Sequence, residues 1–73
     1  MQRLLRYLQH FYDAPDGSLP QDVARTLAIQ EGYDPRGVGG FYQGTAILRK
    51  DNELRTLTDA GREFFEENRH QLD

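Results

Sequence analysis

The chain has 73 residues, enough for one modest hydrophobic core, and the prediction is a single domain over residues 1–73. It contains no cysteine, which excludes disulfides and thiolate zinc sites and favours a cytoplasmic location. The formal net charge of -3, taken alone, argues against nucleic acid as a partner, and no apolar run approaches the roughly 20 residues that span a bilayer.

Residues 1–12 predict an amphipathic helix. Its apolar stripe recurs at spacings of three and four and consists of Leu4, Leu5, Leu8, Phe11 and Tyr12. Tyr7 and Tyr12 are expected to pack at the edge of that stripe. Residues 13–19 cluster turn formers and predict a loop, in which Leu19 could add a short strand contact to a hairpin further along the chain.

A second helix is expected to begin near Leu19 or Pro20. Ser18 would be its N-cap, and Gln21 would complete a capping box of the S-x-x-Q type. The residues expected on its buried face are Val23, Ala24, Leu27 and Ala28. The helix should end by Gly32, because glycine permits a left-handed C-terminal turn.

A third helix is predicted over residues 34–43, with Asp34 as its cap and Pro35 at its first helical position. Val38, Phe41 and Tyr42 recur at helical spacing. The segment also contains Gly37, Gly39 and Gly40, each of which costs about 1 kcal/mol in a helix interior, so tertiary contacts must hold it. The glycines either let something approach the backbone closely or accommodate the crossing of the preceding helix, and both interpretations stay open.

A β-hairpin is predicted next, with strands over 45–50 and 53–58 and a tight turn at Asp51 and Asn52. Thr58 is the expected N-cap of a last helix that runs from Asp59 to about Gln71. The inner face of this helix is expected to hold Ala60, Phe64, Phe65 and Leu72. Residues 35–62 contain five basic and three acidic side chains, so this segment is positive within an acidic chain.

The predicted order of elements, together with the tail LRTLTDAGREFFEEN and its Leu57, Thr58, Gly61 and Arg62, resembles the winged helix-turn-helix family. The resemblance implies an α+β, mainly α fold: a three-helix core, a C-terminal β-hairpin wing and a fourth C-terminal helix. It further implies that the helix over 34–43 lies in the major groove of double-stranded DNA while the wing over 45–58 touches the backbone. The DNA-binding residues that it implies are Arg36, Tyr42, Gln43, Thr45, Arg49, Lys50 and Arg55.

The function implied is that of a transcription regulator or the DNA-reading module of a larger system. The alternative is a winged-helix protein–protein interaction module that does not bind DNA. The third helix is poor in residues that read base edges, and the wing turn carries Asp51 and Glu53, which phosphate repels. For the basic residues the plainer interpretation is solubilising charge, with Lys50 and Glu53 as a local pair. A homodimer is compatible with either function.

No catalytic, cofactor or metal site is predicted, and the chain is not expected to be an enzyme. Ser18 has no neighbouring histidine, and Asp13 and Asp16 are interpreted as loop acids. His10 and His70 could share a metal if the first and last helices pack together, but exposed surface histidines are the favoured interpretation. No membrane partner is expected.

Overall fold

The structure is a computed structural model that describes residues 2–34 and 47–72. This part of the chain is mainly helical α+β. Its α-helices are α1 (Gln2–Tyr12), α2 (Gln21–Gln30) and α4 (Asp59–Asn68), and its strands are β1 (Ser18–Pro20), β2 (Leu48–Asp51) and β3 (Leu54–Leu57). Single 3-10 turns, η1 (Pro15–Gly17) and η3 (Arg69–Gln71), follow α1 and α4. The third helix predicted over 34–43 falls, apart from Asp34, outside the described residues.

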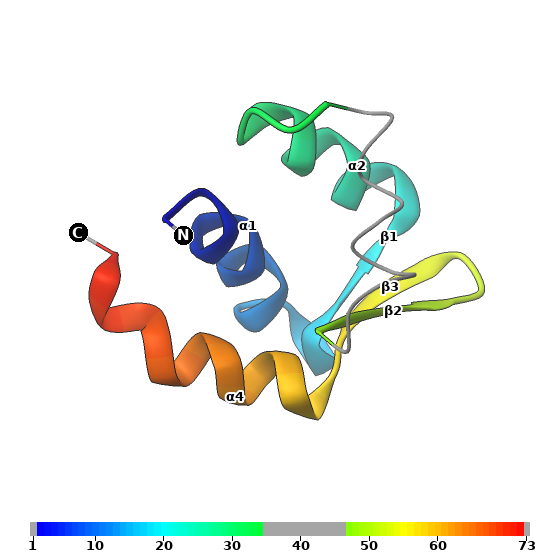
Figure 1. Ribbon diagram of the computed structural model, residues 1–73. Coiled ribbons are helices and arrows are strands. Elements are labelled where there is room, and N and C mark those ends of the chain that lie inside the picture. The colour runs from blue at the N-terminus through cyan, green and yellow to red at the C-terminus, as the bar shows by residue number, and fades with distance from the viewer. Residues whose placement is uncertain (1, 35–46, 73) are drawn as a thin grey trace.

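Helix α1 lies at the centre, with α2 above it and α4 below it in Figure 1, and the strands lie at one end. Four side chains of α1 are fully buried: Leu5, Tyr7, Leu8 and Phe11. The predicted apolar stripe is therefore confirmed, with Leu4 and Tyr12 half-buried at its margins. The expectation for Tyr7 was wrong: it is a core residue rather than an edge residue. Its ring packs against Phe11 at a centroid distance of 5.1 Å, and its hydroxyl donates to the carbonyl of Ala24 at 3.3 Å.

The expected start of the second helix was also wrong. Helix α2 begins at Gln21, with Pro20 as its N-cap, and no side chain caps it. Ser18 lies in β1 instead, where its hydroxyl is 2.9 Å from that of Thr56, so the extended pairing of residues 18–20 prevails over the capping box. Ala24 and Ala28 are buried as predicted, but Val23 is exposed. The helix ends before Gly32, whose φ of +97° confirms the predicted left-handed turn.

The three strands form an antiparallel sheet in the order β1-β3-β2. The strand contact predicted for Leu19 is confirmed, and β1 extends it to the pairs Ser18–Thr56 and Pro20–Leu54. The turn lies one residue later than predicted. Asp51 pairs with Leu54, so Asn52 and Glu53 form the turn, and Asn52 adopts the positive φ of 57°. We call residues 48–57 the hairpin.

Helix α4 begins where it was predicted to begin, with Thr58 as its N-cap. The Thr58 hydroxyl accepts from the Gly61 amide at 3.0 Å and donates to the Ile47 carbonyl at 3.0 Å. Phe65 is fully buried, but Ala60 is exposed, contrary to prediction. Gly61 takes the inner position instead, because a Cβ there would overlap the Ile47 carbonyl. This close approach fixes the base of the hairpin against α4.

The core is shared by α1, α2, α4 and the sheet; Leu48 and Leu57, paired with each other, supply the sheet's contribution. At the opposite end of the molecule the two described ends of the chain meet, since the Gln2 side chain donates to the Gln71 carbonyl at 3.1 Å. Within residues 2–34 and 47–72 there is no helix with the length and apolar character needed to cross a bilayer.

Candidate nucleic-acid interface

The hairpin extends from the helices on the side away from the chain ends (Figure 1). Strand β2 is at the edge of the three-stranded sheet, and its last three residues, Arg49, Lys50 and Asp51, are exposed. Successive side chains of a strand point to opposite faces. The register therefore puts Lys50 on the face of Arg55 and Leu19, and Arg49 on the face of Thr56 and Ser18. The strand thus presents one cation on each face of the sheet.

Arg49 and Lys50 are not engaged by neighbouring groups. In the part of the chain that the structure describes, neither side chain forms a hydrogen bond, an ion pair or a ring contact. The predicted pairing of Lys50 with Glu53 across the turn is not formed. Both charges therefore face solvent and could meet an anionic partner without first breaking an internal contact.

Arg55 differs from these two cations. It is only 8% exposed, and its Nη1 donates to the backbone carbonyls of Asn52 at 3.0 Å and Leu54 at 2.9 Å. The family resemblance implied that Arg55, like Arg49 and Lys50, is a wing contact to DNA. The structure instead directs its guanidinium toward the carbonyls of the hairpin turn.

The remaining predicted DNA-binding residues, Arg36, Tyr42, Gln43 and Thr45, lie outside the described residues, as do Phe41 and the glycines of the third helix. Their roles stay predictions of the sequence. Tyr33 is half-buried, packing edge-on against Tyr7 at 5.9 Å with Arg3 over its ring at 5.6 Å. It is therefore a poor candidate for an exposed aromatic contact with a protein partner.

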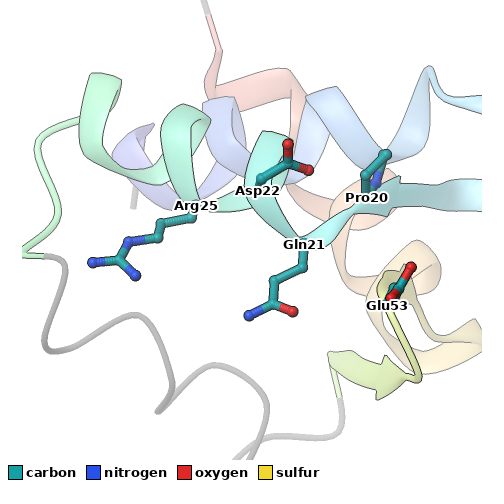
Figure 2. A pocket seen from close by; sticks show the side chains of 5 residues that line it. All are labelled: Pro20, Gln21, Asp22, Arg25 and Glu53. Carbon is teal, nitrogen blue, oxygen red and sulfur yellow. The ribbon is translucent and has the colours of Figure 1, made fainter.

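A groove of about 360 Å³ lies where the hairpin turn meets the start of α2. It is lined by Pro20, Gln21, Asp22, Arg25 and Glu53 (Figure 2). The backbone amide of Gln21 donates to the Glu53 carbonyl at 2.8 Å, which ties the turn to the helix. In Figure 2 the side chains of Gln21 and Arg25 project to the same side of α2, as expected for positions four residues apart.

Arg25 is a cation that the sequence analysis did not single out. It is exposed, and it forms no ion pair with any residue in the two described ranges. In the sequence, its position four residues after Gln21 on the polar face of a predicted helix was the feature that could have identified it. Because Asp22 and Glu53 line the same groove, the local charge is mixed, which makes Arg25 a weaker candidate than Arg49 or Lys50.

A separate charged cluster joins α1 to the end of α2. Arg6 Nε is 3.0 Å from one Glu31 carboxylate oxygen, and His10 Nε2 is 3.5 Å from the other. The hydrogen bond from Arg6 lowers the pKa of Glu31, and the hydrogen bond from His10 adds to this effect against the opposing influence of burial. The cluster is an interhelical contact and offers no nucleophile.

No group of three or more His, Asp or Glu side chains within residues 2–34 and 47–72 is arranged to hold a metal ion. His70 is exposed in η3, and the partner of His10 is Glu31. Comparison of the chain with protein-family models, with curated proteins and with solved structures gives no significant match.

Proposed function

We propose that this chain is a DNA-binding domain of the winged helix-turn-helix type, acting as a transcription regulator or as the DNA-reading module of a larger system. The observation that carries the proposal is a pair of exposed cations on the edge strand of a projecting hairpin, Arg49 and Lys50, whose side chains form no hydrogen bond, ion pair or ring contact with the described residues. Phosphate contacts supply most of the affinity of such domains for duplex DNA. In this proposal the hairpin is the wing and rests on the DNA backbone.

The described fold supports the proposal in a second way. The link between α1 and α2 contributes β1 to the hairpin, which makes a three-stranded antiparallel sheet beside the helices. This is compatible with a small winged-helix arrangement. The proposal assigns residues 34–43 to the helix that enters the major groove, with Arg36 as its leading contact. In this scheme the acidic charge elsewhere on the domain weakens nonspecific binding.

Titration of the protein against duplex DNA at several salt concentrations tests this function. Binding should weaken as salt rises, because each phosphate neutralised by a cation releases counterions. Lys50→Gln and Arg49→Gln should each reduce the slope of log affinity against log salt by about 0.9. Arg3→Gln, at the start of α1 on the side of the chain ends, is the charge-matched control and should leave the slope unchanged.

Absence of binding by the wild-type protein at low salt would refute the proposal. Wild-type slopes in both hairpin variants would instead show that the contact surface is elsewhere on the domain.

A second candidate is a protein-interaction module, and one observation favours it. Leu54 of the hairpin is 42% exposed and Val23 of the first turn of α2 is 39% exposed, and each follows in sequence an acidic residue that lines the groove. Exposed apolar side chains with a charged rim are typical of contact surfaces. Salt-insensitive self-association in analytical ultracentrifugation, lost in a Val23→Ser, Leu54→Ser double variant, would support this candidate over DNA binding.

A further inference from the structure

The turn of the hairpin is held by three consecutive carbonyl groups. Those of Asn52 and Leu54 accept hydrogen bonds from Nη1 of Arg55, and that of Glu53, between them, accepts from the backbone amide of Gln21. One side chain of the hairpin and the first residue of α2 therefore fix the turn together. An isolated two-stranded hairpin is marginally stable in water, so these three hydrogen bonds help to hold the turn in place.

Arg55 occupies a position that is costly for a cation. It is directly opposite Lys50 in the antiparallel register, with Leu19 on its other side, and it is buried. Like charges in opposite positions repel, and a buried charge needs hydrogen-bond partners. The hydrogen bonds to the turn carbonyls supply such partners, and they point the guanidinium along the hairpin toward its end. The exposed amine of Lys50 then remains on the surface beside the turn.

We propose that Arg55 is a positioning residue: it fixes the hairpin turn so that Lys50 is held in place to meet a DNA phosphate, and Arg55 itself does not contact the nucleic acid. This inference rests on the proposed function and refines it. It removes one residue from the predicted contact surface and gives that residue a different role. It also predicts that the effect of Arg55 on binding is transmitted through Lys50.

The variant Arg55→Lys distinguishes a positioning role for Arg55 from a direct contact with phosphate. Lysine keeps the positive charge, so an electrostatic contact with phosphate would survive the change, with affinity within about twofold of the wild type. The lysine ammonium ends one bond short of the position of Arg55 Nη1, the single nitrogen that donates to both carbonyls, so the positioning role predicts a loss of affinity of about threefold to tenfold. Measurement is by titration with the same duplex DNA at fixed low salt.

A double-mutant cycle distinguishes positioning from a general effect on folding. If Arg55 acts through Lys50, then Arg55→Lys should cost less than about 1.5-fold in affinity when Lys50→Gln is already present. If Arg55 contacts phosphate independently or merely stabilises the domain, its effect should be the same in both backgrounds. An additive cycle would therefore overturn the inference.

Hydrogen exchange on the free protein tests the physical basis without DNA. Arg55→Lys should speed amide exchange in residues 49–56 by about tenfold while leaving the amides of α1 unchanged, and Lys50→Gln should change neither. Unchanged exchange in the hairpin would overturn the inference even if affinity fell. If the wild type binds no DNA, the proposed function fails, while the exchange result still shows whether Arg55 holds the turn.

Discussion

The cations of the helices and those of the hairpin differ in what they contact. In the helical part of the molecule Arg62 and Arg69 lie over the ring of Tyr12, with their guanidinium carbons 5.1 and 5.3 Å from its centroid. Arg3 lies over Tyr33, and Arg6 binds Glu31. These four side chains fasten one helix or turn to another, so their charges are largely committed to the fold.

On β2 the situation is reversed. Arg49 and Lys50 form no hydrogen bond, ion pair or ring contact with the residues described in 2–34 and 47–72. A surface charge without an internal contact adds little to the stability of a fold. The comparison separates the basic side chains that already contact other described residues from the two on β2 that do not. Whether each charge is already engaged is more informative than its place in the sequence.

The largest change in stability is expected where the base of the hairpin contacts α4. Gly61→Ala should lower the free energy of unfolding by about 2–3 kcal/mol, because the new Cβ overlaps the Ile47 carbonyl at the base of the hairpin. Glu63→Ala, an exposed position on the same helix, should stay within about 0.5 kcal/mol of the wild type. Urea denaturation measures both, and equal stabilities for the two variants would contradict the close approach.

A smaller effect tests the comparison of cations directly. Arg62→Gln should cost about 0.5–1 kcal/mol of stability, since it removes the guanidinium from the Tyr12 ring. Arg49→Gln should change stability by less than about 0.5 kcal/mol. The order should be reversed for DNA affinity, where Arg49→Gln has the larger effect. Thermal-unfolding and DNA-binding measurements on both variants check this. If the same variant had the larger effect in both assays, the distinction between the two groups of cations would be wrong.

The smallest effect is the pH dependence of the contact between α1 and α2. The pKa of Glu31 is lowered in the folded state by Arg6, so this contact contributes stability above the ordinary carboxyl pKa of 4.5 and loses it as the pH falls further. Arg6→Gln should therefore be less stable than the wild type at about pH 6, by less than about 1 kcal/mol, and the gap should narrow at about pH 3. Thermal midpoints at both pH values measure the gap. If the difference between the two thermal midpoints were larger at about pH 3 than at about pH 6, the expected direction of the pH dependence would be wrong.

Much of the fold could be predicted from local signals in the sequence. Helical spacing identified Leu5, Leu8 and Phe11 as core residues, and a threonine before a helical run identified Thr58 as a cap. The hairpin was located to within a residue at its turn. These features depend on periodicity and on backbone preferences, which neighbouring residues determine.

The errors arose where two distant segments compete for the same group. Ser18 was expected to cap α2, but Thr56 lies beside it in the sheet and binds its hydroxyl. Ala60 was predicted on the inner face of α4, but Gly61 occupies that position. The carbonyl of Ile47 comes so close to Gly61 that a residue without a side chain is needed, and the pattern of the helix alone does not show this. Both outcomes depend on contacts that span many residues, which a local pattern does not contain.

For the candidate site the division is similar. Local sequence patterns were sufficient to predict that basic residues gather on a hairpin between a glycine-rich segment and a capped helix. The folded arrangement was needed to tell them apart: Arg49 and Lys50 are exposed, while Arg55 is buried and bound to the turn. Lys50 and Arg55 share a face of the sheet, and they differ because Arg55 is on the central strand β3, between Leu19 and Lys50, whereas Lys50 is on the edge strand β2. The central position of β3 depends on its pairing with β1, a segment far away in the sequence.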